Sequence, residues 1–151
     1  MEPLTVTRRS TLPADRREVW RHLADADLLG EWLGAEIAVE VVPGASGTVT
    51  TQDGRRRQVV VTHVEHEAGV GFVWWDEDDP AGVSAVELRL DEDATDTAVL
   101  TVTETLDPAA SLVGALGGRA CDVHEVGATV AERWGLRLGV LAADLSAPVL
   151  V

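Results

Sequence analysis

The chain has 151 residues, of which 46% are hydrophobic and 25% are charged, so we expect one globular domain over residues 1–151. Its formal net charge of -14 argues against partners such as nucleic acid or an anionic membrane, which attract basic proteins. Every one of the 12 residues counted as Lys or Arg is arginine, and the absence of lysine excludes Schiff-base and P-loop chemistry.

Cys121 is the one cysteine, so no internal disulfide can form and a zinc-finger pattern is absent. No hydrophobic run approaches the roughly 18 residues of a membrane span, and no secretory signal is evident. We therefore expect a cytoplasmic protein. No motif in the sequence indicates a cofactor or a metal, and we expect neither.

The N-terminal part predicts a strand over residues 4–10 and then two short helices. Pro13 opens the first helix, because the first helical turn tolerates its missing N–H, and Trp20 belongs to its apolar stripe. The second helix covers residues 28–33 and ends at Gly34.

From Ile37 onward the hydrophobic period changes to two, which predicts strands. Turn signals such as Asp53-Gly54 separate short runs, and this spacing favours an antiparallel meander. The predicted strands cover residues 37–42, 48–51, 58–65, 70–75, 84–90 and 97–106. Apolar and polar residues alternate along them, so one face of the sheet should be covered and the other should face water.

The C-terminal part predicts a long amphipathic helix, with a stripe formed by Val130, Trp134, Leu138, Leu141 and Leu145. Arg133 and Arg137 fall outside this stripe, and residues 108–127 show no clear pattern. The predicted fold class is therefore α+β: an antiparallel sheet of about six or seven strands around a long C-terminal helix, with two short helices between the first and second strands. Because one helix cannot fill the concave side of such a sheet, we also expect a cavity.

Four stretches, in this order, resemble the helix-grip superfamily of START-like and Bet v 1-like (SRPBCC) proteins. They are LPADRREVWRHLADADLLGEWLG (12–34), VTHVEHEAGVGFVWW (61–75), SAVELRLDEDATDTAVLTVTET (84–105) and RWGLRLGVLAADL (133–145). The resemblance is strongest to the branch related to the C-terminal domain of the activator of Hsp90 ATPase. It implies a helix-grip fold with a pocket, and it implies no particular reaction. Residues 108–127 match no part of the pattern, and Glu104-Thr105-Leu106 stands where the family usually has a His-Ser-Gly-type end to the last strand.

The function that we expect is binding of a small hydrophobic or aromatic ligand between the sheet and the last helix. The expected ligand-binding residues are Phe72, Trp74, Leu88, Val102, Glu104, Trp134, Leu138 and Leu141. One alternative is a pocket enzyme of the polyketide cyclase or aromatase type. Another is a chaperone- or regulator-associated interaction domain.

Glu104 and His124 are the candidate catalytic residues of the enzyme alternative. Glu104 shares a strand face with Val102, so it suits a general base or a ligand anchor, unless it lies at the pocket rim beside water or an arginine. His124 follows Cys121, a pairing that suits a thiolate–imidazole site, half a metal site, or simply a loop near the pocket mouth.

Trp74 and Trp75 should point to opposite faces of one strand, Trp74 inward and Trp75 outward. Trp75 then marks a homodimer interface or packs under a neighbouring side chain. The acids at 76–79 indicate a solvated hairpin end or, alternatively, a cation site. The arginines at 55–57 either bind an anionic ligand or an acidic partner, or they balance nearby acids. His63 and Glu65 share the outward face of a predicted strand and form a weak metal-binding pattern.

Overall fold

The structure, a computed structural model, describes residues 4–106 and 123–146, apart from the side chains of 79–81 and 123–128. Its elements are β1 (Leu4–Leu12), α1 (Arg16–Ala24), α2 (Ala26–Leu33), β2 (Ala35–Ala38), β3 (Ser46–Thr51), β4 (Arg56–Glu65), β5 (Gly69–Asp76), β6 (Asp79–Ala94), β7 (Thr97–Leu106) and α4 (Val123–Ser146). The predicted α+β class and element order are confirmed, and the predicted last helix lies inside the longer α4.

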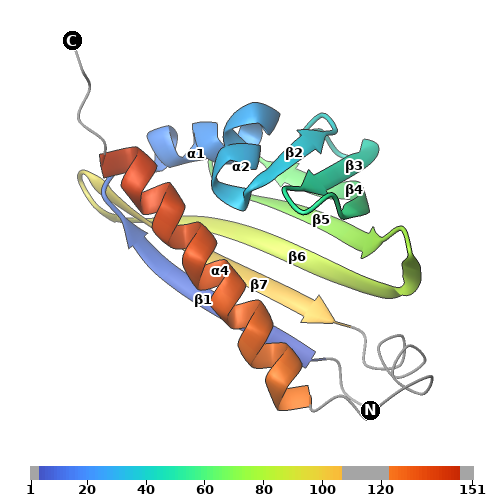
Figure 1. Ribbon diagram of the computed structural model, residues 1–151. Helices are drawn as coiled ribbons and strands as arrows, with labels where there is room; N and C mark the ends of the chain where they lie inside the picture. The colour runs from blue at the N-terminus through green and yellow to red at the C-terminus, as the bar shows by residue number, and fades with distance from the viewer. Residues whose placement is uncertain (1–3, 107–122, 147–151) are drawn as a thin grey trace.

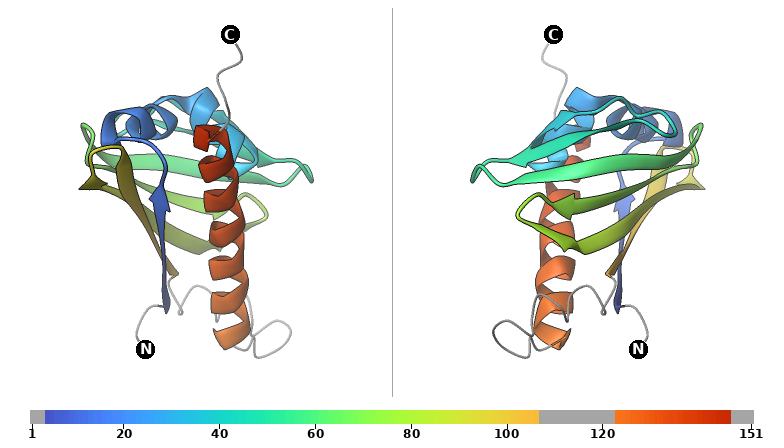
Figure 2. Two further views of the ribbon diagram at one scale, coloured as in Figure 1. Left: turned by 90° about the vertical axis from the view of Figure 1, so that its left-hand side faces the viewer. Right: turned by 90° about the vertical axis from the view of Figure 1, so that its right-hand side faces the viewer.

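The seven strands form one antiparallel sheet in the order β1-β7-β6-β5-β4-β3-β2. The long helix α4 runs diagonally over the sheet close to β1, while α1 and α2 lie near one end of the sheet (Figure 1). Seen from the side, the strands curve around α4 (Figure 2). This is the helix-grip arrangement that the sequence predicted.

The two short helices begin and end at residues suited to those positions. Asp15 caps α1 by accepting a hydrogen bond from the backbone N–H of Glu18 at 2.8 Å, so the helix begins at Arg16 and not at Pro13 as predicted. Gly34 ends α2 with a φ of 69°, a left-handed conformation that glycine adopts at little cost.

The predicted strand over residues 37–42 is wrong beyond Ala38, where β2 ends. The chain turns there because residues 44 and 45 pair with β4 instead. The N–H of Gly44 donates to the carbonyl of Val61 at 2.8 Å, and the N–H of Val61 donates to the carbonyl of Ala45 at 2.9 Å. Gly44 has a φ of 84°, which the turn signal around Pro43 anticipated.

The core lies between the inner face of the sheet and the three helices. Strand residues two apart in sequence, such as Val86, Leu88 and Leu90, are buried together, as the alternation predicted. Beside Phe72 and Leu29 the structure leaves a space of about 20 Å³, room for roughly one water molecule. In the part of the chain that the structure describes, no helix has the length and apolar character needed to cross a membrane.

Candidate ligand cavity

A cavity of about 220 Å³ opens where α4 faces the ends of β4, β5, β6 and β7. Its described lining is formed by Arg57, Trp74, Trp75, Asp76, Gly82, Ser84, Glu104, Leu106, Val130, Arg133, Trp134 and Arg137. The predicted cavity between sheet and helix is therefore present, but it occupies one end of the interface and its wall is more polar than expected.

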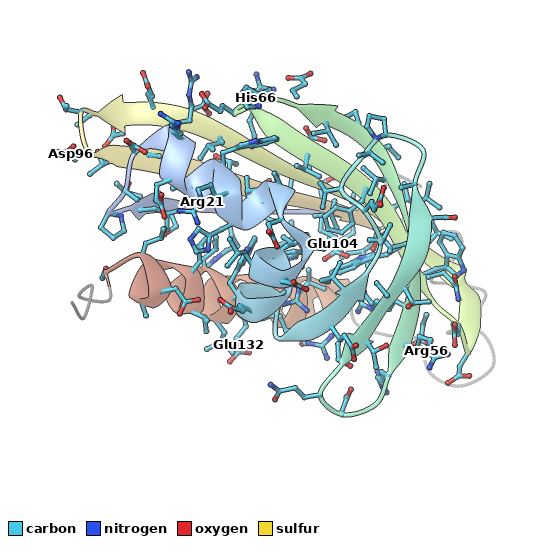
Figure 3. All side chains as sticks on the ribbon, turned by 90° about the horizontal axis from the view of Figure 1, so that it is seen from above. Arg21, Arg56, His66, Asp96, Glu104 and Glu132 are labelled. Carbon is cyan, nitrogen blue, oxygen red and sulfur yellow. The ribbon has the colours of Figure 1, made fainter. Side chains whose placement is uncertain are left out.

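Glu104 is the centre of the hydrogen bonds at this cavity, and only 5% of the residue is exposed. One carboxylate oxygen, Oε1, accepts the indole N–H of Trp134 at 2.9 Å. The other, Oε2, accepts the indole N–H of Trp74 at 2.9 Å and the hydroxyl of Ser84 at 2.6 Å. Figure 3 shows Glu104 inside the fold, whereas Arg56 and Glu132 lie at its periphery.

The strand register explains how these groups meet. Trp74 lies opposite Ser84, and Glu104 lies opposite Val86, so Glu104 and Ser84 are diagonal neighbours on one face of the sheet. Trp134 reaches them from α4. Three donors and one carboxylate are thus brought together by β5, β6, β7 and α4, and none of these buried polar groups is left without a partner.

Each indole that binds Glu104 also packs against another aromatic ring. The rings of Trp74 and Trp134 are stacked with centroids 6.1 Å apart. Trp134 also meets Trp32 at 6.3 Å, and Phe72 stands edge-on to Trp74 at 5.1 Å. Because ring packing and the Glu104 hydrogen bonds act on the same side chains, both tryptophans are held in one orientation.

Two arginines lie over the faces of these rings. The guanidinium of Arg57 is 4.3 Å from the centroid of Trp74, and that of Arg137 is 4.6 Å from Trp134 and 5.7 Å from Trp74. Such contacts place a cation over the electron-rich face of the ring. Burial lowers the pKa of both groups, to about 10 for Arg137, where the neighbouring charge of Arg57 acts in the same direction and Glu104 opposes it. Both arginines remain charged at neutral pH.

Neither arginine was expected at the cavity, although the sequence contained a signal for the position of each. Arg57 precedes Val59 and Val61 in the two-residue period of the inner face of β4, so the alternation places it inward. Arg55 and Arg56 are exposed, whereas Arg57 is half-buried. Arg137 follows Trp134 by three residues and so lies at the edge of the apolar stripe, not opposite it.

Trp75 is half-buried and borders the cavity. In the regular β4–β5 ladder it lies opposite Gln58, between the pairs Trp74↔Val59 and Asp76↔Arg57, so the alternation keeps it on the face opposite to that of Trp74. The β5–β6 ladder is irregular here, because it passes from Trp74↔Ser84 directly to Asp76↔Asp79 and leaves residues 80–83 opposite Trp75. The acids that follow form a hairpin end as predicted, with Glu77 and Asp78 exposed.

The expected ligand-binding residues divide into two groups. Trp74, Glu104 and Trp134 line the cavity. The remaining five belong to the hydrophobic core and are at most 5% exposed: Phe72, Leu88, Val102, Leu138 and Leu141. The accessible part of the site therefore lies at the ends of β4–β7, and not along the middle of the sheet as expected.

The other candidate side chains take no described part in the cavity. His124 lies in the first turn of α4, but its side chain and all of Cys121 are outside the described residues, so the predicted pair of Glu104 with His124 stays a prediction. His63 on β4 pairs with Glu87 on β6, across Gly71 of the intervening strand β5, with Nε2 and Oε1 2.9 Å apart, and not with Glu65. Among the described residues no group of three or more His, Cys, Asp or Glu side chains is placed to hold a metal ion.

This fold is shared by many solved structures. DynU16, a protein of the dynemicin biosynthetic locus, has a TM-score of 0.71 at 24% identity over 95% of this chain, which spans 47% of that protein, about half its length. A protein from Mesorhizobium loti has a TM-score of 0.72 at 19% identity, with 96% of this chain and 100% of the other covered. The Aha1 dimer from Colwellia psychrerythraea has a TM-score of 0.69 at 14% identity, with 94% and 96% covered. A search of curated protein sequences finds no match.

The fold and the cavity define a helix-grip protein, an antiparallel sheet closed over a long C-terminal helix. Residues 13–142 match the model of one family within this class, the Activator of Hsp90 ATPase homolog 1-like proteins. The chain belongs to that family, and the resemblance seen in the sequence is confirmed.

Proposed function

We propose that this protein binds a small aromatic molecule in the cavity between α4 and the ends of β4–β7. The observation that carries the proposal is the cavity itself, about 220 Å³ in volume, with three tryptophans in its wall. Binding sites for small molecules are concave, rich in aromatic side chains and equipped with a few converging polar groups. This cavity has all three properties.

The volume sets the size of the ligand. A protein cavity of about 150 Å³ holds a benzene molecule, and drug-sized ligands occupy about 300–1,000 Å³. A cavity of about 220 Å³ therefore suits one aromatic ring with a substituent. It is too small for a long lipid chain without a change of structure.

The hydrogen bonds of Glu104 support binding without catalysis. A general base must turn a lone pair toward the substrate, and three of the roughly four acceptor sites of Glu104 are already occupied. Both oxygens of Glu104 instead accept hydrogen bonds from the protein, two of them from indoles that also form the cavity wall. The role that fits this geometry is to position Trp74 and Trp134.

Native mass spectrometry of protein purified gently from its own host tests the proposal, because it shows a retained small molecule directly. We expect an adduct that disappears on denaturation. Val130→Trp fills the cavity from α4 and should abolish the adduct, whereas Leu136→Trp on the outer side of the same helix, where Leu136 is 68% exposed, should leave it unchanged. An adduct equally abundant in both variants would contradict the proposed site.

A further inference from the structure

The described wall of the cavity carries more positive than negative charge. Three arginines line it, Arg57, Arg133 and Arg137, against two acids, Asp76 and Glu104. The chain as a whole has the opposite balance, with 26 acids and 12 Lys or Arg. A local excess of arginine in so acidic a protein indicates that the cavity favours negative charge.

Arg57 and Arg137 have no described acid bound to them. Within the described part of the chain, neither guanidinium takes part in an ion pair or donates a hydrogen bond. What they contact are ring faces, and cation–π contacts use the flat side of a guanidinium and leave the N–H groups around its edge available.

Glu104 is the buried acid whose negative charge acts on both arginines. Its two oxygens nevertheless accept their hydrogen bonds from Trp74, Ser84 and Trp134. Its charge attenuates the repulsion between the two arginines without binding either of them. Burying cations without hydrogen-bonded partners is unfavourable, and the lowered pKa of Arg57 and Arg137 reflects this. An anion that enters the cavity would supply the missing partner.

We infer that the ligand is an aromatic carboxylate, with Arg57 and Arg137 as the residues that bind its carboxylate group. The guanidinium edge matches the two oxygens of a carboxylate, which makes arginine better suited to this contact than a point charge. The ring of the ligand then lies against the aromatic wall that includes Trp75. The inference rests on the proposed function, since it names the chemistry of the ligand that the same cavity would hold.

The test compares matched pairs of probes that differ only in charge: benzoate with benzamide, and 1-naphthoate with 1-naphthamide. Binding is followed by NMR through the indole N–H signals of the five tryptophans. We expect the signals of Trp74 and Trp134 to shift, and each carboxylate to bind at least about tenfold more tightly than its amide, the ratio expected for one or two charge-assisted hydrogen bonds.

Variants then locate the anion-binding groups. Arg57→Gln and Arg137→Gln should each lower carboxylate affinity by about tenfold and leave amide affinity unchanged, and Lys at either position should retain part of the preference. The matched control is Arg56→Gln, which changes an exposed arginine of the same strand and should have no effect.

The remaining outcomes separate the inference from the proposed function. Equal affinity for carboxylates and amides, or a preference that survives both Gln variants, would overturn the inference and leave a cavity that binds neutral rings. If no probe shifts either indole but native mass spectrometry shows a retained molecule, only the inference fails. If neither experiment detects a ligand, both fail.

Discussion

Glu104 on β7 accepts a hydrogen bond from the indole N–H of Trp134 on α4, at 2.9 Å, and this bond joins the C-terminal helix to the sheet beside the cavity. The same carboxylate holds Trp74 and Ser84 on two other strands. Removing the charge of Glu104 therefore affects four elements at once, and the consequences for stability and for binding can be measured separately.

Glu104→Gln should lower the free energy of unfolding by about 1–3 kcal/mol, measured by urea denaturation. The glutamine amide has one acceptor oxygen, so its NH₂ group would face an indole or hydroxyl donor and leave that group without a partner. Glu87→Gln is the control, because the Glu87 side chain is 40% exposed and forms an ion pair with His63. Equal stability of Glu104→Gln and wild type would refute the positioning role.

Arg137→Met should leave the stability of the ligand-free protein unchanged or raise it by roughly 1 kcal/mol. Methionine keeps an apolar stem of similar length against Trp134 and removes a buried cation that Arg57 and Arg133 repel. Thermal unfolding of Arg137→Met beside Arg56→Met, an exposed arginine, provides the comparison. A loss of more than about 1 kcal/mol in Arg137→Met would show that the cation–π contacts outweigh the cost of burial.

The affinity for an aromatic carboxylate should depend on pH in a defined direction. Burial lowers the pKa of Arg137 to about 10, so the group is charged in the ligand-free protein below that pH. Carboxylate affinity should be constant between about pH 6 and about pH 9, where Arg137 and benzoate both keep their charges, and should fall as the pH rises through about 10. Titration of benzoate by NMR over this range measures it, with benzamide as the probe that should show no such fall.

Homodimerisation through Trp75 stays a prediction. Sedimentation velocity of the wild type and of Trp75→Asp tests it, because an aspartate in an interface would dissociate a dimer into monomers. The half-buried position of Trp75 at the cavity predicts a second effect of the same substitution, a weaker affinity for aromatic carboxylates. A monomeric wild type would leave Trp75 with the second role alone.

The sequence was sufficient to predict the element order and the inward direction of Glu104, because both follow from the two- and four-residue periods of apolar side chains. It did not indicate that Trp75 borders the cavity, because the irregular β5–β6 pairing beyond Trp74 arises from how two strands pair and leaves no mark in the alternation of β5. The hydrogen bonds of Glu104 were also beyond reach, because they join residues up to 30 positions apart.

The inward position of Arg57 could have been predicted from the sequence. Its alternation with Val59 and Val61 was readable, but it stands in a run of three arginines, and such a run usually lies in solvent. The strand period decided the outcome: the neighbours Arg55 and Arg56 are exposed and Arg57 faces the cavity. A charged residue in phase with buried neighbours is therefore the signal to look for.

Gly139 should be a site where alanine stabilises the protein. Both Gly135 and Gly139 interrupt α4, and a glycine inside a helix costs about 1 kcal/mol relative to alanine. Beyond its two chain neighbours and the nearby backbone of its own helix, a Cβ at Gly139 would have no atom within 4 Å, whereas one at Gly135 would lie 2.6 Å from a guanidinium nitrogen of Arg8. Gly139→Ala should therefore raise the free energy of unfolding by up to about 1 kcal/mol, and Gly135→Ala by less, because the Arg8 side chain must move.

Gly30→Ala is the matched opposite case. Gly30 also lies in a helix, α2, but its Cβ would stand 2.5 Å from the backbone carbonyl oxygen of Ala35, which cannot move without displacing β2. We expect this variant to be destabilised by at least about 1 kcal/mol in urea denaturation despite the gain in helix propensity. If Gly139→Ala proved as destabilising as Gly30→Ala, the outer side of α4 would have to pack against another molecule in solution. Sedimentation velocity of Gly139→Ala would then show whether that molecule is a second copy of the chain.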